Sequence, residues 1–225
     1  MKPTTTNQPN QTFDKNKPYP LAEAIEIVKQ NAKAKFDETL EAHFCLGIDP
    51  KKGEQQIRGV LVLPHSFGKS KKVAAFVTAD RKKEAQEAGA DIVYSEQDVD
   101  ELKKTGKIDF EIAVAIPEMM KTIAPLAKIL GPKGLMPSPK NETITTNLKK
   151  TLEELKKGKI AYKNDDTANL HQAFGKASMD SAKLIENFNA LFDALKKSKP
   201  DSSKGVFMKK VVICSTMGPA VKVQV

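Results

Sequence analysis

The stretch Leu40-Glu-Ala-His-Phe-Cys-Leu-Gly-Ile48 decides how this chain of 225 residues is expected to fold. Apolar residues occupy every second position from Leu40 to Ile48, and Glu41 and His43 stand between them. Such alternation is typical of a strand with one buried face. A turn at 51–53 leads to a second apolar run, so we expect the two runs to form an antiparallel pair with one buried face.

The segment before this strand divides into a tail and a helix. Residues 1–18 are polar and carry a single aromatic side chain, so we expect a flexible tail. After Pro20, the apolar residues Leu21, Ile25 and Val28 recur at helical spacing. This pattern predicts an amphipathic helix that starts at a proline suited to the first turn.

From Lys72 onward, short apolar strands alternate with helices. The expected elements, in chain order, are the segments 73–78, 81–88, 90–94, 98–104, 110–116 and 118–130. This alternation predicts a small parallel sheet with crossover helices. Asn147 then resembles the N-cap of a helix that Gly158 ends.

After Gly158 the antiparallel style returns, with a strand at 159–163, a helix started by Asp180, and strands from Val206 and Val221. The predicted fold class therefore combines α/β and α+β. The two expected domains are a discontinuous α+β domain with an antiparallel sheet, 1–66 and 158–225, and an inserted Rossmann-like βαβ domain, 67–157.

The charge balance indicates a polyanionic partner. The chain carries 37 Lys and Arg against 28 Asp and Glu, with a net charge of +9. The expected insertion holds 17 basic and 14 acidic residues, which leaves 20 and 14 for the terminal domain, so the polyanion should prefer the latter. Arg58 and Arg81 are the only arginines, and lysines bind phosphates more than they read bases.

Signals for a membrane or secreted protein are absent from the sequence. No stretch approaches the roughly 20 apolar residues that span a bilayer, and the first residues lack an apolar signal core. We therefore expect a soluble, cytoplasmic protein.

Few motifs in the sequence indicate an enzyme, although a βαβ domain often binds nucleotides. Residues 67–70 imitate the end of a phosphate-binding loop, but Leu63 stands where that loop needs glycine, so we interpret them as a hinge. The three histidines lie far apart in sequence, and the two cysteines, Cys45 and Cys214, are interpreted as core residues; a cross-strand contact between them stays open. We expect no catalytic residues, no metal and no cofactor, and a nucleotide-dependent enzyme remains the competing hypothesis.

Three other stretches suit RNA, and the first begins at Lys35. The Lys35 ammonium can meet a phosphate, Phe36 can lie against a ribose or base, and the Thr39 hydroxyl can bond to a 2′-hydroxyl. Phe36 as a buried staple is an equally open alternative.

The second stretch mixes donors that suit sugar and phosphate oxygens. Its candidates are Lys163, Asp165, His171, Lys176 and Ser178. Asp165 opposes simple electrostatic attraction, so it either accepts hydrogen bonds from RNA or only shapes a turn.

The third stretch runs from Ser215 through Thr216, Met217 and Gly218. It lies in a segment, 204–225, with four lysines and no acidic residue. Gly218 leaves room for an RNA backbone, and Met217 offers polarizable apolar surface. A turn that ends a strand explains the glycine equally well.

The loop Gly131-Pro-Lys-Gly-Leu-Met-Pro-Ser-Pro-Lys140 is rigid and cationic. Its prolines and glycines restrict the backbone, and it carries Lys133 and Lys140 but no acidic residue. A rigid helix-to-strand turn is the alternative to a binding loop.

In this order and at these separations, several fragments resemble the L-one family of large-subunit ribosomal proteins. The fragments are Ala34-Lys-Phe-Asp-Glu-Thr39, Gly47-Ile-Asp-Pro50, Arg58-Gly59, Leu63-Pro-His65, Glu87-Ala-Gly-Ala-Asp91, Ile129-Leu-Gly-Pro-Lys-Gly-Leu-Met-Pro137, Gly175-Lys-Ala-Ser178 and Thr216-Met-Gly-Pro219. The resemblance runs from about Leu21 to the end, and it implies the same discontinuous two-domain fold.

The resemblance also implies a function. Such a protein is a monomer within the ribosome that binds large-subunit ribosomal RNA at the mobile stalk and assists release of deacylated transfer RNA from the exit site. It also represses translation of its own messenger RNA. The RNA contacts that the resemblance implies are Lys35, Phe36, Thr39, Glu41, Asp165, His171, Thr216, Met217 and Gly218, with Lys133 and Lys140 facing transfer RNA.

Overall fold

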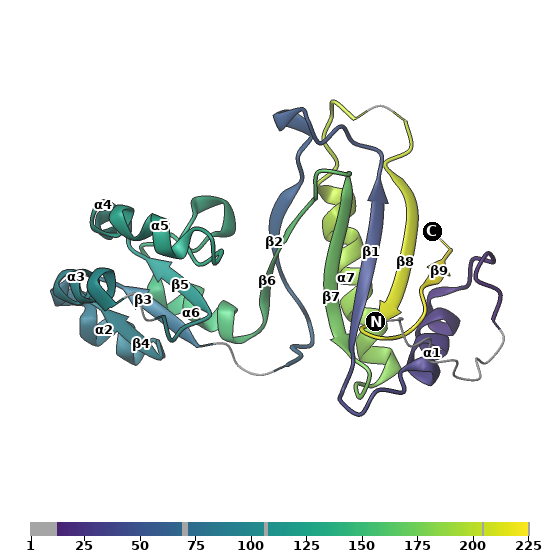
Figure 1. Ribbon diagram of the computed structural model, residues 1–225, viewed down its shortest axis with the longest axis horizontal. Helices are drawn as coiled ribbons and strands as arrows, with labels where there is room; N and C mark the ends of the chain where they lie inside the picture. Colours follow the sequence, from purple (N-terminus) through teal and green to yellow (C-terminus); the bar gives the residue numbers. More distant parts are fainter. Residues whose placement is uncertain (1–12, 69–71, 106–107, 204, 225) are drawn as a thin grey trace, which may run out of the picture. The chain divides into compact units, whose positions relative to one another are not determined.

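The computed structural model describes residues 13–68, 72–105, 108–203 and 205–224 (Figure 1). By its contacts the chain separates into two compact units. The terminal unit comprises Met1–Ile57 and Lys163–Val225, and the inserted unit comprises Arg58–Tyr162. The domain boundaries expected at 66/67 and 157/158 lie a few residues inside the inserted unit.

An antiparallel sheet of four strands, in the order β7-β1-β8-β9, organises the terminal unit (Figure 1). The strands are β1 (Thr39–Leu46), β7 (Asn169–Lys176), β8 (Met208–Ser215) and β9 (Val221–Val223). Each neighbouring pair is antiparallel, so both ends of the chain build one sheet, as the antiparallel style of the sequence predicts.

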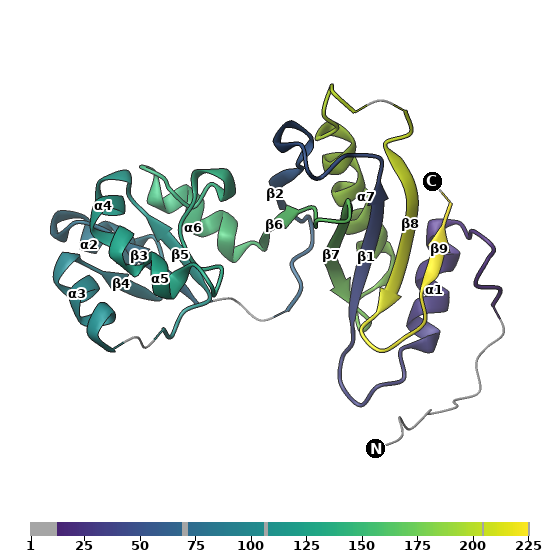
Figure 2. The ribbon, with the colours of Figure 1, turned by 45° about the horizontal axis from the view of Figure 1, so that its top comes forward.

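One face of this sheet is covered by helices and the other is open. The alternate residues Leu40, Ala42, Phe44 and Leu46 of β1 are buried, whereas the residues between them are partly exposed. The buried face packs against α7 (Ser181–Lys197), where Phe44 stacks on Phe188 with ring centroids 6.0 Å apart. Helix α1 (Leu21–Asn31) packs on α7, β8 and β9. Figures 1 and 2 both show α7 behind β1 and β7.

The expected pairing of the first two apolar runs is wrong. Strand β1 pairs with β7 and β8, while β2 (Arg58–Val62) pairs with β6 (Lys159–Lys163) in a separate ribbon of two strands. Both edges of β1 are occupied because β7 and β8 supply buried residues at alternate positions, such as Phe174 and Ile213. Strand β2 has no buried residue, so it offers no apolar face to that sheet.

Residues 13–19 lie along the β9 edge. The Tyr19 N–H donates to the carbonyl of Lys222 at 3.0 Å, and the Gln224 N–H donates to the Tyr19 carbonyl at 2.8 Å. The Asp14 N–H donates to the Tyr19 hydroxyl at 3.0 Å. Tyr19, the residue that follows the segment expected to be flexible, therefore pairs with a sheet edge that would otherwise present unpaired backbone groups. The rest of that tail, 1–12, lies outside the described residues.

The inserted unit contains a parallel sheet in the order β4-β3-β5, which confirms the predicted parallel sheet. Its strands are β3 (Val73–Phe76), β4 (Ile92–Tyr94) and β5 (Ile112–Ala115), and its longer helices are α2 (Lys82–Glu87), α3 (Glu96–Thr105) and α6 (Leu148–Lys156). Asn147 caps α6 through its side chain, as predicted, and Gly158 ends this helical segment at φ +94°.

The helix expected at 118–130 is broken into short pieces. They are η3 (Pro117–Met119), α4 (Met120–Ile123), η4 (Ala124–Leu126) and α5 (Ala127–Leu130). Pro125 lies in η4 and has no N–H to donate, so a continuous α-helix cannot form through it.

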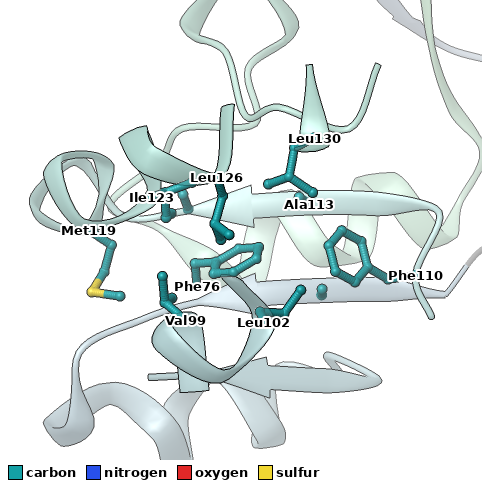
Figure 3. Close-up of a cluster of buried hydrophobic side chains, with 11 residues drawn as sticks. Phe76, Val99, Leu102, Phe110, Ala113, Met119, Ile123, Leu126 and Leu130 are labelled. Carbon is teal, nitrogen blue, oxygen red and sulfur yellow. The ribbon is translucent and has the colours of Figure 1, made fainter. Parts of the chain in front are cut away.

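Both faces of the parallel sheet are covered. On one face, Phe76 and Phe110 pack with side chains of α3 and of the broken helical segment, including Leu102, Ile123 and Leu126 (Figure 3). The other face packs against α2 and α6, and the buried residues there are Val73, Ala75, Val77, Ala85, Val114, Ile116, Leu148, Leu152 and Leu155. Helices on both faces explain why the strands read as continuous apolar runs.

Candidate nucleic-acid interface

Segments far apart in the sequence meet at one end of the terminal sheet. Thr39 begins β1 and lies opposite Lys176 at the end of β7, while Leu40 lies opposite Ser215 at the end of β8. The Thr216 N–H donates to the Thr39 carbonyl at 3.0 Å, and the Thr39 N–H donates to Thr216 Oγ1 at 3.1 Å. We call this end of the sheet the sheet-end surface; its residues are Lys35, Phe36, Thr39, Lys176, Ser178, Thr216, Met217 and Gly218.

A buried carboxylate joins the two turns of this surface. Glu38 is 1% exposed, and its two oxygens accept hydrogen bonds from the Ala34 N–H at 2.9 Å and the Met217 N–H at 3.0 Å. Burial raises the pKa of Glu38, but the hydrogen bonds that its carboxylate accepts, led by those from the two backbone amides, together outweigh burial and lower this pKa. Glu38 was not among the site residues predicted from the sequence. The signal was present, because Glu38 continues the alternate set that Leu40 and Ala42 place on the buried face.

A second acid, Asp37, ties the end of β7 to the same surface. The Ser178 N–H and hydroxyl donate to the two Asp37 carboxylate oxygens at 3.1 and 2.9 Å. Lys176 Nζ donates to the Asp37 carbonyl at 3.1 Å and to Thr39 Oγ1 at 2.9 Å. Lys176, Ser178 and Thr39 thus form the polar frame of the surface while Ser178 stays exposed.

Two large apolar side chains project from this frame. Phe36 is 54% exposed and Met217 is 74% exposed, so Phe36 is not a buried staple. Lys35 and Thr216 are also exposed. RNA bases can lie against exposed apolar side chains, and RNA phosphates and sugars can bind lysine and hydroxyl groups. This set of side chains therefore suits RNA.

The roles expected for Ser215 and Gly218 differ from what the structure shows. Ser215 is 1% exposed, so its hydroxyl is not placed for the direct RNA contact predicted from the sequence. A Cβ added to Gly218 would run into Ser215 Oγ. The missing side chain at Gly218 is therefore explained by packing within the protein, in line with the alternative of a turn that ends a strand.

Glu41 and His171 lie on the open face of the sheet, away from the helices. Glu41 lies opposite Cys214 on β8, and His171 lies opposite His43 on β1. The His171 side chain is 52% exposed. The open face therefore extends the sheet-end surface along β1 and β7.

Asp165 shapes the turn that precedes β7. Its Oδ1 accepts from the Thr167 N–H at 2.9 Å and the Asn169 N–H at 2.6 Å, and its Oδ2 accepts from the Thr167 hydroxyl at 2.6 Å. The Thr167 hydroxyl, together with the backbone amides, lowers the pKa of Asp165 to about 2. Oδ2 also lies 3.6 Å from His171 Nε2, so Asp165 presents a fixed negative charge beside the open face.

The remaining candidate lysines lie apart from this surface along the chain. Lys163 is exposed at the end of β6, next to the buried Asn164. Lys133 and Lys140 are exposed in the inserted unit, where Gly134 takes φ +69° and Lys140 lies in η5 (Pro139–Asn141). Of the expected hinge 67–70, residues 69–70 lie outside the described residues.

The two cysteines are not core residues. Both are partly exposed on the open face, where Cys45 lies opposite Lys210 and Cys214 lies opposite Glu41. Cys45 lies four residues along β1 from Glu41, the residue opposite Cys214. The two thiols are therefore too far apart for the cross-strand contact that the sequence left open. Within the described residues, no three His, Cys, Asp or Glu side chains are placed to hold a metal ion.

Among the residues that the structure describes, no helix combines the length and the apolar character that crossing a bilayer requires.

The family described as "Ribosomal protein L1p/L10e family" matches residues 28–219, which contain every residue of the sheet-end surface and of the open face discussed above.

Proposed function

Because the chain belongs to the ribosomal protein L1p/L10e family, whose members are large-subunit ribosomal proteins that bind ribosomal RNA, we propose that it binds this RNA through the sheet-end surface and the adjoining open face. This family is one of structural RNA-binding proteins and not of enzymes. The proposed target within the ribosomal RNA is the mobile stalk beside the exit site.

The observation that carries the proposal is the exposure of Phe36 and Met217 on turns that Glu38 fixes. Exposed apolar side chains normally cost solubility, and a rigid frame that holds two of them outward is explained by a partner that covers them. Lys35 beside Phe36 supplies a cation for phosphate, and the Thr216 hydroxyl supplies a donor for ribose oxygens. Glu41 and Asp165 fit only as acceptors from 2′-hydroxyls or base amines.

The finer parts of the function extend this proposal. We place the protein, as one copy, on cytoplasmic ribosomes, where it assists release of deacylated transfer RNA from the exit site. Lys133 and Lys140 would face that transfer RNA. Repression of its own messenger RNA would use the same surface on a similar RNA structure. The proposed fold has two domains, with 67–157 inserted as a Rossmann-like domain between 1–66 and 158–225.

A filter-binding titration against a ribosomal RNA stalk fragment, at several salt concentrations, tests the proposal. Lys35→Ala should reduce the slope of log affinity against log salt by about 0.7 to 0.9, because one phosphate contact is lost. Lys83→Ala changes an exposed lysine on α2 of the inserted unit and is the matched control, with an unchanged slope.

Phe36→Ala and Met217→Ala test the apolar part of the surface. Each should cost about 1 to 3 kcal/mol of RNA affinity and leave the salt slope unchanged. If both variants stay folded and bind the fragment as tightly as the parent, the surface is misplaced. If the parent itself prefers the stalk fragment no more than a random RNA of equal length, the proposed target is wrong.

A further inference from the structure

A row of four polar side chains crosses the open face of the terminal sheet. His43 Nδ1 on β1 lies 2.7 Å from His171 Nδ1 on β7, and His43 Nε2 lies 3.0 Å from Cys214 Sγ on β8. On the far side, His171 Nε2 lies 3.6 Å from Asp165 Oδ2. The two rings meet edge to face at 61°, with centroids 4.9 Å apart.

The proton positions in this row follow from what each partner can donate. A neutral imidazole carries one N–H and one acceptor nitrogen, so the contact between the two Nδ1 atoms needs one donor and one acceptor. Asp165 is ionised and can only accept, which favours the proton of His171 on Nε2. His171 Nδ1 is then the acceptor, and His43 Nδ1 must donate to it.

The same reasoning fixes the other end of the row. With its proton on Nδ1, His43 presents Nε2 as an acceptor, and the Cys214 thiol is the donor at 3.0 Å. Burial, followed by the nearby Glu41 carboxylate, raises the pKa of Cys214 and keeps this thiol protonated. Burial, followed by the neighbouring His171, lowers the pKa of His43 and keeps this ring neutral. The hydrogen bonds thus run in one direction, from Cys214 through His43 to His171, and the Asp165 charge lies beyond hydrogen-bond distance of His171 Nε2.

We propose that His43, anchored by Cys214, is a positioning residue that holds His171 in its Nε2–H form and in one ring orientation. The inference rests on the proposed function, because it gives His171 a defined role on the RNA-binding face. The distance of 3.6 Å to Asp165 exceeds a hydrogen bond, so the Nε2–H is free to donate to an RNA oxygen. His171 therefore recognises an acceptor, such as a phosphate or 2′-hydroxyl oxygen, and does not itself accept from RNA.

Nitrogen-15 NMR of the histidine rings in the RNA-free protein tests the positioning directly. The parent should show His171 as a single Nε2–H tautomer at neutral pH. His43→Leu removes the donor to Nδ1 and should give a mixture of tautomers, whereas His43→Gln keeps a side-chain N–H and should restore much of the Nε2–H form. His65→Leu, at the one histidine outside the row, is the matched control and should leave the His171 signals unchanged.

Affinity for the stalk RNA fragment gives the second measurement. His43→Leu should weaken binding about three- to tenfold, the loss expected for one poorly oriented hydrogen bond, and His43→Gln should bind within about twofold of the parent. Cys214→Ser keeps a hydroxyl donor and should resemble the parent more closely than Cys214→Ala does.

The two hypotheses fail in different ways. An Nδ1–H or mixed tautomer of His171 in the parent, or a folded His43→Leu variant with an unchanged tautomer and unchanged affinity, would overturn the positioning role alone. A parent with the expected tautomer but no preference for stalk RNA would overturn the proposed function, and with it the assignment of the His171 donor to RNA.

Discussion

The two sheets of this protein use their faces in opposite ways. In the terminal sheet, β1 buries every second residue and leaves Glu41, His43 and Cys45 on an open face. In the inserted sheet, all four residues of β3 are buried because helices cover both sides. An antiparallel sheet can leave one face uncovered, whereas a parallel sheet needs crossover connections that cover its faces. The terminal sheet therefore keeps an exposed face, and this is the face used in the proposed contact with ribosomal RNA.

The difference predicts where a mutation acts on stability and where it acts on binding. Core changes in the inserted sheet should affect unfolding, since its strands have no free face. Changes at exposed positions of the terminal sheet should affect RNA affinity, since these positions carry little of the packing. Four experiments break or sharpen this contrast.

The largest effect is expected for Phe76→Ala in the inserted sheet. Phe76 is fully buried and lies with its ring centroid 5.1 Å from that of Tyr94 and 5.9 Å from that of Phe110. Removing the ring leaves a cavity and should cost about 3 to 5 kcal/mol of unfolding free energy, measured by denaturant titration. Phe36→Ala, at an exposed ring, is the comparison and should change stability by less than about 0.5 kcal/mol. Equal losses in both variants would contradict the contrast.

Glu38→Gln should give the next largest effect. An amide in place of the carboxylate turns an N–H toward one of the two backbone donors, from Ala34 or Met217, and should cost about 1 to 3 kcal/mol of stability. The folded-state pKa of Glu38 lies below its ordinary value of 4.5, so the carboxylate stabilises the fold above about pH 4.5 and loses this effect as the pH falls through the folded-state pKa. RNA affinity should fall as well, because both turns loosen.

The control for Glu38 is Glu41→Gln, a partly exposed acid on the same strand. Its stability at neutral pH should stay within about 0.5 kcal/mol of the parent. Thermal unfolding measured from pH 7 to pH 3 distinguishes the two acids. A Glu38→Gln protein as stable as the parent, with the same pH dependence, would show that the carboxylate does not join the two turns.

A smaller effect is expected for Asp165→Asn. The loss of charge weakens the bonds from Thr167 and Asn169, and we expect about 1 kcal/mol of destabilisation, kept low because the carboxylate is partly exposed and screened by water. The pKa of Asp165 is lowered from 3.8 to about 2, so its stabilising effect is complete above about pH 4 and lost as the pH falls toward 2. Urea titrations at pH 6, 4 and 2.5 should therefore show a shrinking difference between variant and parent. A constant difference would contradict this assignment.

The smallest effect is expected for the double variant Lys133→Ala with Lys140→Ala. Both lysines are exposed in the inserted unit, outside the sheet-end surface. Affinity for the stalk fragment should change by less than about 0.5 kcal/mol, and the salt slope should stay the same. Lys35→Ala is the comparison, with its reduced slope. A slope reduced by the double variant would place part of the ribosomal RNA contact in the inserted unit.

The sequence predicted the local elements well, because their signals lie within a few residues. Alternation at 40–46 gave the buried face of β1, and Asn147 and Gly158 marked the limits of the α6 segment. The exposure of Lys35 and Met217 on the sheet-end surface could also be predicted from the sequence, because both residues lie in turns. Pro125 is a signal within the sequence against a continuous helix, and it breaks the helix predicted through 118–130.

The sequence alone could not predict which strands pair or which distant side chains meet. Strand β1 pairs with β7 and β8, which lie more than a hundred residues away in the sequence, because both strands have side chains to bury. The nearer strand, β2, has no buried residue and does not pair with β1. The hydrogen bond from the Met217 N–H to Glu38 and the contact between His43 and His171 likewise arise only when distant segments meet. Local periodicity therefore determined the strands and helices of this protein, and composition determined its basic character, while long-range pairing decided which side chains share a surface. Backbone propensity acts between neighbours in the chain, whereas burial and hydrogen bonding act between neighbours in space.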